Sequence, residues 1–232
     1  MHRYVMPDWV KERVLRRQGK PFAHDAIEAA RSALVVVDMQ NYFCAEGFPA
    51  EVPLSRAVVP NINRLAAAMR AAGGTVVWIQ TDSAEALTRW GNHHKYMLTP
   101  PRVEKRLAGL DATAKGFELF ADLEPMPGDL RVRKATYSAF MPGSSNLDAE
   151  LKARGIESVL ITGTATNVCC ETSARDAMVR DYRVVMLSDG NATWTDEEHA
   201  ATLNTFAIFF GDVMTTDEAI ARIAPAAMRK VG

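Results

Sequence analysis

Short apolar runs alternate along the chain with segments in which apolar residues recur every three or four positions. The runs predict strands at residues 33–37, 75–80, 130–133, 158–162 and 183–187. The helical spacing predicts helices at about 58–69 and 145–154, and another that begins near residue 168. Such alternation predicts an α/β fold, with a mainly parallel sheet of about six strands and helices on both faces.

The remaining segments divide the chain into an arm, a core and an excursion. Two T-x-x-E capping boxes, at Thr195 and Thr215, predict the starts of the last two helices. Residues 83–128 lack a regular pattern and are expected to form a long excursion over one edge of the sheet, as lids and binding loops do. Residues 1–30 are polar and are interpreted as an N-terminal arm or short helix. Residues 31–232 are expected to form one domain.

Composition and charge narrow the class of protein. Of the 232 residues, 48% are hydrophobic and 24% charged, which is typical of a globular domain. The 27 Lys and Arg residues balance 28 Asp and Glu residues, so no basic field is available for nucleic acid or an anionic membrane. There is no signal-peptide pattern and no apolar stretch that could span a membrane. Three cysteines make no disulfide framework, so we expect a cytoplasmic protein that acts on a small molecule.

Three residues with catalytic chemistry follow predicted strands. Asp38 follows the first strand, Lys134 follows the third, and Cys169 lies after the fourth at a predicted helix start. Because ligands of an open parallel sheet bind at the carboxyl ends of its strands, these three groups are expected at one edge. A helix start favours a thiolate, and the carboxylate can accept the thiol proton. Alone, each residue also has a structural interpretation, as a turn cap, a solvated strand end or a small buried side chain.

Each of the three residues belongs to a longer motif. The motifs read DMQNYFC, KATYSAF and GTATNVC, at residues 38–44, 134–140 and 163–169. In order and spacing they resemble the motifs of the isochorismatase-like cysteine hydrolase family, and the resemblance covers about residues 31–223. It implies a Rossmann-like α/β/α sandwich and a catalytic triad of Asp38, Lys134 and Cys169.

The resemblance also implies how the site is completed. It places a non-proline cis peptide bond between Thr164 and Ala165, which turns the N–H of Ala165 toward the same point as the N–H of Cys169. Two converging N–H groups make an oxyanion hole. Cys170 stands where the family usually has an apolar residue, so Cys169 is interpreted as the nucleophile. The residues expected to contact substrate are Tyr137, Phe43, Asn92 and Trp78.

The implied reaction is hydrolysis of a linear amide or ureido C–N bond, with release of ammonia and a thioester on Cys169. The motifs are most similar to those of ureidoacrylate and N-carbamoyl amidohydrolases. No cofactor is expected, and no metal, because the Asp-x-His spacing of the metal-binding branch is absent after the first motif. The alternatives are an isochorismatase that cleaves a vinyl ether, a nicotinamidase-like amidase and a non-catalytic binding module. Since the family commonly forms dimers or tetramers, a homo-oligomer is expected, with an arm long enough to cross to a neighbour.

Overall fold

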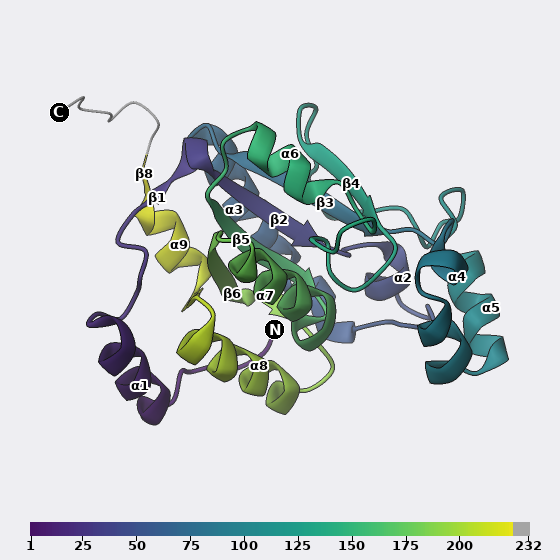
Figure 1. Ribbon diagram of the computed structural model, residues 1–232, viewed down its shortest axis with the longest axis horizontal. Coiled ribbons are helices and arrows are strands. Elements are labelled where there is room, and N and C mark those ends of the chain that lie inside the picture. The colour runs from purple at the N-terminus through teal and green to yellow at the C-terminus, as the bar shows by residue number, and fades with distance from the viewer. Residues whose placement is uncertain (225–232) are drawn as a thin grey trace.

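The computed structural model describes residues 1–224, which contain a six-stranded sheet with helices on both faces (Figure 1). All neighbouring strands are parallel, in the order β4-β3-β2-β5-β6-β7. The predicted parallel sheet of about six strands is therefore confirmed. The strands are β2 (Ser32–Val37), β3 (Thr75–Thr81), β4 (Leu130–Lys134), β5 (Ser158–Thr164), β6 (Arg183–Ala192) and β7 (Asp212–Met214).

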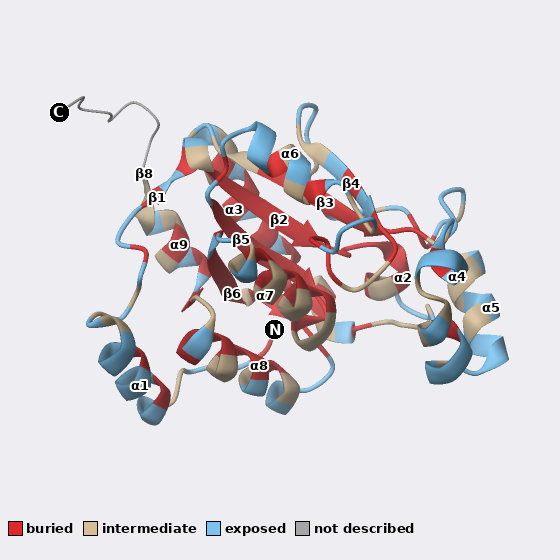
Figure 2. Ribbon diagram, viewed as in Figure 1, coloured by how far each residue is buried: buried red, intermediate tan, exposed pale blue. Residues whose placement is uncertain are grey.

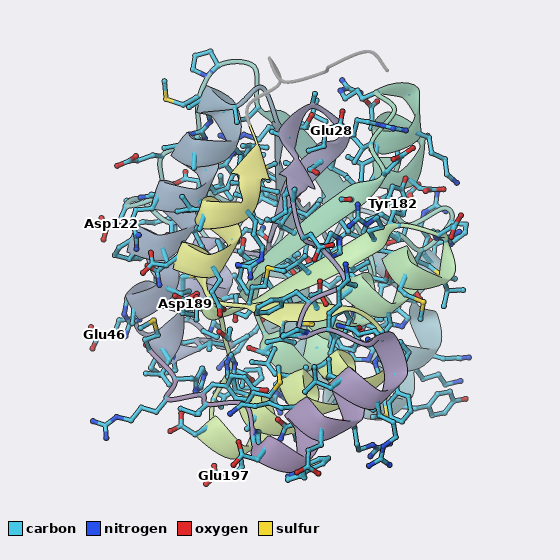
Figure 3. The ribbon with its side chains drawn as sticks, turned by 90° about the vertical axis from the view of Figure 1, so that its left-hand side faces the viewer. Glu28, Glu46, Asp122, Tyr182, Asp189 and Glu197 are labelled. Carbon is cyan, nitrogen blue, oxygen red and sulfur yellow. The ribbon has the colours of Figure 1, made fainter. Side chains whose placement is uncertain are left out.

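Two layers of helices cover the sheet. One face packs against α3 (Val59–Ala71) and α9 (Thr216–Arg222). The other face packs against α1 (Asp8–Gln18), α6 (Leu147–Ala153), α7 (Glu171–Val179) and α8 (Asp196–Phe209). Both predicted capping boxes are present, at the starts of α8 and α9. In Figure 3, Asp189 lies at the start of α9, where its carboxylate accepts the N–H of Thr216 at 2.7 Å.

The central strands are buried on both sides (Figure 2). Successive apolar side chains alternate between the two helical layers, so Val35 and Ile79 contribute to one core and Val36 and Trp78 to the other. The edge strand β4 alternates between exposed and buried residues, as its charged sequence predicts. The sheet is thus a rigid platform whose polar chemistry is confined to the ends of its strands.

The irregular segment leaves the sheet after β3 and returns at β4, on the right of Figure 1. It contains α4 (Ala86–Arg89), a π-helix (His93–Met97) and α5 (Pro100–Gly109). Its base is closed, because the N–H and hydroxyl of Ser83 donate to the carbonyls of Leu110 (3.1 Å) and Leu107 (2.8 Å). The rest of the segment runs back beside α2 (Asn41–Cys44), with the N–H of Phe120 on the carbonyl of Met39 at 2.9 Å.

The N-terminal arm lies against its own chain. Helix α1 packs beside α8, and β1 (Ile27–Glu28) pairs in parallel with β8 (Ile223–Ala224). This arrangement does not support the expectation that the arm crosses to a neighbouring molecule. The predicted domain boundary at residue 232 falls outside the described residues. Two 3₁₀ turns, Ala29–Arg31 and Pro53–Val58, complete the elements. Within residues 1–224, no helix is both long and apolar enough to cross a membrane.

Candidate active site

Three neighbouring strands end in a row of polar side chains. Lys134 ends β4, Thr81 ends β3, and Asp38 directly follows β2. The register pairs Thr81 with Lys134, and the N–H of Asp38 donates to the carbonyl of Ile79 on β3 at 3.1 Å. Because parallel strands carry their carboxyl ends to the same edge, residues far apart in sequence meet there, as the sequence analysis expected.

The row is held by short contacts between buried groups. Lys134 Nζ lies 2.7 Å from Asp38 Oδ2 and donates to Thr81 Oγ1 at 2.7 Å and to the carbonyl of Thr136 at 3.0 Å. The hydroxyl of Thr81 donates to Asp38 Oδ1 at 2.9 Å. Gln40 fixes Thr81, since its side-chain amide bonds both the N–H (2.7 Å) and the carbonyl (3.0 Å) of that residue. Both charged side chains are fully buried, so each depends on the other for compensation.

Cys169 approaches this row from the neighbouring strand β5. Its Sγ lies 3.7 Å from Lys134 Nζ, and it belongs to a π-helix (Thr166–Cys170) that leads into α7. Cys169 is 7% exposed, whereas Cys170 and Cys44 are completely buried. All three cysteines are free thiols. Cys169 is therefore the cysteine that combines contact with the buried ion pair and access from outside.

Charge and burial define the resting protonation of the site. Burial raises the pKa of Cys169 to about 12, which the Lys134 ammonium opposes and the Asp38 carboxylate reinforces. For Lys134, burial lowers the pKa, but the charges of Asp38 and of the Cys169 thiolate outweigh it, so the pKa is raised. The resting site therefore holds a neutral thiol beside an ion pair. The expectation that the helix start favours a thiolate was wrong, because burial dominates.

The backbone around the row is unusual at three places. Asp38 has a φ of 52°, a left-handed conformation that is uncommon for residues other than glycine. The peptide bond between Thr164 and Ala165 is cis. Gly163 has a φ of 120°, and a Cβ there would lie 2.1 Å from the carbonyl oxygen of Val37. Only glycine lets β5 approach β2 so closely, next to Asp38.

Residues 32–218 match the model of the isochorismatase domain family. The chain belongs to this family. It is 36% identical to the ureidoacrylate amidohydrolase RutB of Variovorax paradoxus, over 95% of this chain and 91% of that protein. The fold is similar to that of a cysteine hydrolase from Pseudomonas syringae pv. phaseolicola (TM-score 0.74, 30% identity, 88% and 97% of the two chains). It is also similar to N-carbamoylsarcosine amidase from Thermoplasma acidophilum (TM-score 0.62, 26% identity, 81% and 97%).

In this member of the isochorismatase domain family, a buried contact and a partly buried one hold the segment that precedes Cys169. Thr166 Oγ1 lies 2.9 Å from His199 Nδ1, and His199 Nε2 lies 2.9 Å from the carbonyl of Ser188. The hydroxyl of Thr193 donates to Asn167 Oδ1 at 2.7 Å. Burial lowers the pKa of His199 to about 4, so its ring is neutral and donates to Ser188 while it accepts from Thr166. No motif in the sequence indicates this contact, because His199 lies 33 residues further along the chain, in α8.

The arm reaches the same network. The His2 ring stacks on the His199 ring, with centroids 4.3 Å apart. His2 Nε2 accepts the N–H of Thr193 at 2.9 Å, which leaves Nδ1 to donate to Asp196 at 2.7 Å. The second residue of the chain thus supports the two residues that hold the segment before Cys169.

An aromatic group flanks the site on the side of the excursion. Tyr137 is half-buried, with its ring centroid 4.5 Å from that of Trp90 and 5.5 Å from that of His93. Trp90 and His93 stack at 3.9 Å. Tyr137 was a predicted substrate contact, whereas Trp90 and His93 were missed because the irregular segment carries no positional signal. Across residues 1–224, no three His, Cys, Asp or Glu side chains gather so that they could hold a metal ion.

The other predicted substrate contacts have different surroundings. Phe43 is half-buried and packs edge-on against Tyr42, with centroids 5.1 Å apart. Asn92 is exposed and precedes the π-helix of the excursion. Trp78 is fully buried in the core beneath α3, and its indole N–H donates to Asp129 at 2.8 Å. The interpretation of Trp78 as a pocket residue was wrong, because it points from the middle of β3 into the core.

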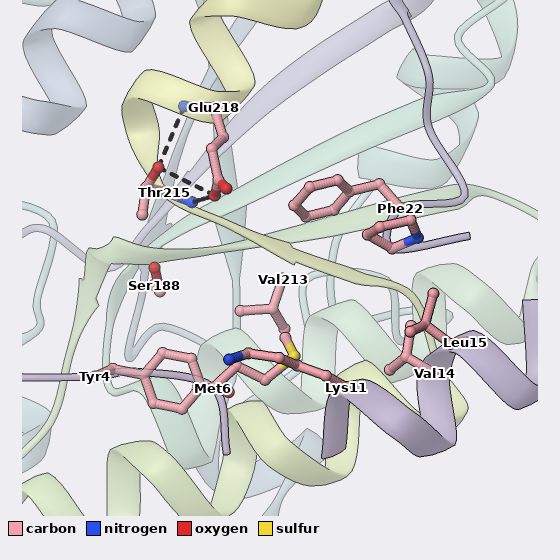
Figure 4. Close-up of a pocket in the computed structure, with 11 residues that line it drawn as sticks. Tyr4, Met6, Lys11, Val14, Leu15, Phe22, Ser188, Val213, Thr215 and Glu218 are labelled. Carbon is pink, nitrogen blue, oxygen red and sulfur yellow. Dashed lines mark hydrogen bonds between the residues drawn. The ribbon is translucent and has the colours of Figure 1, made fainter. Parts of the chain in front are cut away.

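The cavity shown in Figure 4 lies elsewhere. It has a volume of about 420 Å³ and is formed between the arm, β7 and the start of α9. Its walls are mostly apolar and include Tyr4, Met6, Val14, Phe22 and Val213. It contains none of the three residues of the predicted triad, so it is distinct from the candidate site at the edge of the sheet.

Proposed function

We propose that the protein hydrolyses the C–N bond of an N-carbamoyl (ureido) compound and releases ammonia through a thioester on Cys169. The observation that carries this proposal is the contact of Cys169 Sγ with a buried Asp38–Lys134 ion pair at the ends of adjacent strands. The similarity of the chain to a ureidoacrylate amidohydrolase and to N-carbamoylsarcosine amidase supports the choice of a ureido group.

In the first half-reaction, Asp38 accepts the proton of the Cys169 thiol as Sγ attacks the carbonyl carbon. The C–N bond to the terminal nitrogen then breaks, and Asp38 returns the proton to that nitrogen, which leaves as ammonia. The product on the protein is a carbamoyl thioester. Because the thiol is neutral at rest, deprotonation has to accompany attack, which requires a base in direct contact.

In the second half-reaction, Asp38 accepts a proton from water, which attacks the thioester carbonyl. The C–S bond breaks, the thiol regains its proton, and the product leaves as a carbamate. Lys134 stays charged throughout, because its raised pKa lies far above neutrality. It compensates the buried charge of Asp38 and stabilises negative charge on sulfur.

The N–H groups of Ala165 and Cys169 are proposed to bind the oxyanion. The carbonyl of Ala165 accepts the N–H groups of Val168 (3.1 Å) and Cys170 (3.2 Å). The N–H of Cys169, which lies between these two donors, is not one of its partners. This geometry supports Cys169 N–H as a donor to substrate, where one such donor contributes about 3–4 kcal/mol to the transition state.

Ammonia release from a panel of compounds tests the function. The panel holds 3-ureidoacrylate, 3-ureidopropionate, N-carbamoylsarcosine and nicotinamide, together with isochorismate assayed for vinyl ether cleavage. We expect turnover of the ureido compounds, which Cys169→Ala abolishes. Turnover of nicotinamide or isochorismate alone would identify one of the alternative reactions. Failure of every compound would favour a non-catalytic binding module.

A homo-oligomer, either a dimer or a tetramer, and a cytoplasmic location are also proposed. Exposed apolar side chains support the first, and Leu87, Tyr96 and Met97 of the excursion are 54%, 70% and 74% exposed. Free, buried cysteines support the second. Light scattering at micromolar concentration is expected to give a multiple of the 25.5 kDa chain mass, and a mass of one chain contradicts the oligomer.

A further inference from the structure

Helix α5 brings a basic side chain to the edge of the sheet that carries Cys169. The last turn of the helix packs on the first motif, since a Cβ at Gly109 would lie 2.5 Å from the ring of Tyr42. The same turn is bonded to the end of β3, where the hydroxyl of Ser83 donates to the carbonyl of Leu107 at 2.8 Å. Arg106, which lies in this turn, is half-buried.

Arg106 has no acidic partner among the residues that the structure describes. Its side chain makes no ion pair and no hydrogen bond within residues 1–224, in contrast with other cations near this edge. Lys134 forms an ion pair with Asp38, Arg133 with Asp82 at 2.8 Å, and Arg89 with Glu85. A half-buried guanidinium without a counterion, beside a site that is otherwise neutralised, has five N–H donors available for an anion.

The charge of Arg106 affects the pKa values of four groups around the site. It works against burial, which raises the pKa values of Tyr42, Tyr137 and Cys169, and it acts with burial to lower the pKa of His93. Arg102, one turn earlier on the same helix, contributes to the pKa of Tyr42 but not to those of the other three groups. Of the two arginines, Arg106 is therefore the one whose charge acts on Cys169 and Tyr137.

We propose that Arg106 binds the carboxylate of the substrate, so that the enzyme selects ureido acids over neutral ureas. The proposal rests on the proposed function, because it places the ureido carbonyl at Cys169 and the acid group at α5. A planar guanidinium matches a carboxylate through two parallel N–H···O bonds, which gives orientation as well as affinity.

The test compares two probes and a matched pair of variants. The probes are 3-ureidopropionate and propylurea, which share a ureido group and a three-carbon chain but differ in the carboxylate. The variants are Arg106→Gln and Arg102→Gln, which remove one positive charge each from the same helix. Steady-state ammonia release gives kcat and KM, and calorimetric titration of Cys169→Ala protein, with and without Arg106→Gln, gives binding without turnover.

Arg106→Gln is expected to raise KM for 3-ureidopropionate roughly 10- to 150-fold, as the loss of charge-assisted hydrogen bonds predicts. Its effect on propylurea should be within about twofold, and Arg102→Gln should change neither probe by more than that. Arg106→Lys should recover part of the affinity. Equal KM values for wild type and Arg106→Gln would overturn the proposal, as would equal losses for both probes.

The titration separates this proposal from the proposed function. If the wild type releases no ammonia from any ureido compound, the proposed function fails. In that case, binding of 3-ureidopropionate to Cys169→Ala protein that Arg106→Gln abolishes would still support the carboxylate site. Absence of binding at millimolar concentration, or binding that Arg106→Gln leaves unchanged, would refute the site. A melting curve of Arg106→Gln that matches the wild type confirms that the variant is folded.

Discussion

The row of strand ends at Asp38, Thr81 and Lys134 differs from the first part of the excursion, residues 83–110, in how it is stabilised. The row is fully buried, and each of its side chains is fixed by partners on neighbouring strands. In the excursion, no side chain of α5 is fully buried, and several large apolar residues are exposed (Figure 2). We infer that the chemical step depends on the rigid row, whereas substrate selection depends on the excursion, which can change at little cost in stability.

The largest effect is expected at the nucleophile. Cys169→Ala removes the attacking sulfur and should lower kcat/KM by at least about 10³-fold, while the melting temperature changes little. The matched control is Cys170→Ala, because Cys170 is the adjacent buried thiol and should leave most of the activity. Steady-state ammonia release by both variants, together with their melting curves, checks the assignment. Retained activity in Cys169→Ala, with loss in Cys170→Ala, would contradict it.

The next effect concerns the buried ion pair. Lys134→Met leaves the Asp38 carboxylate buried without its partner, which should cost about 3–5 kcal/mol in folding or activity. Lys134→Arg keeps the positive charge but not the compact shape of the ammonium, so its kcat/KM should also be low.

The control for this prediction is the neighbouring residue on β4. Arg133 pairs with Asp82 but its side chain is 61% exposed, so Arg133→Gln should cost no more than about 1 kcal/mol. Melting curves and steady-state kinetics of the three variants are the measurement. Near wild-type kcat/KM and stability in Lys134→Met would reduce the catalytic group to Asp38 and Cys169.

The third prediction uses the raised pKa of Cys169. Below its pKa a thiol yields about tenfold more thiolate per pH unit, so alkylation by iodoacetamide should rise roughly 100-fold between pH 7 and 9 without a plateau. Cys169 should be labelled before the two fully buried cysteines. A rate that levels off below pH 9, or earlier labelling of Cys170, would show that burial does not control this thiol.

The smallest effect is expected from His199, which supports Thr166. Its pKa is lowered to about 4 by burial, so the folded state favours the neutral ring. The unfolded chain takes up a proton near its ordinary value of about 6.5. The stability that His199 contributes is therefore present above pH 6.5 and is lost as the pH falls toward 4, by about 2 kcal/mol between pH 7 and 5.

His199→Gln should reduce the difference in the free energy of unfolding between pH 7 and pH 5, which urea unfolding at both pH values measures. His93→Gln is a suitable control, because His93 is half-buried and lies in the excursion. If the free energy of unfolding of His199→Gln has the same pH dependence as that of the wild type, protonation of His199 does not account for the loss of stability at low pH.

Much of the fold and the predicted triad could be derived from the sequence, since both depend on local patterns. The apolar runs predicted five strands. Asp38, Lys134 and Cys169 follow three of them, and the parallel topology brings these residues to one edge of the sheet. The sixth strand, β7, was not located, because Asp212–Met214 is too short to show a pattern. Thr81 could have been found, since it ends a predicted strand as Lys134 does.

Other parts of the site depend on contacts that no local pattern reveals. The contact of His199 with Thr166 joins residues on α8 and the π-helix, and the position of Arg106 depends on how the excursion folds back. Trp78 was assigned to the pocket from its residue type, although strand alternation would have placed it beneath α3. Side-chain direction along a strand is therefore a better guide than residue type.

The closed base of the excursion has a consequence for how such enzymes diversify. Ser83 and Leu110 are joined by a backbone hydrogen bond, so the two ends of residues 83–110, the first part of the excursion, are neighbours in space. A segment whose ends meet can be lengthened, shortened or exchanged with that of a relative without changing the order or register of any strand. Grafting residues 83–110 from another family member should therefore transfer substrate preference as a single unit, because the row at Asp38, Thr81 and Lys134 stays untouched.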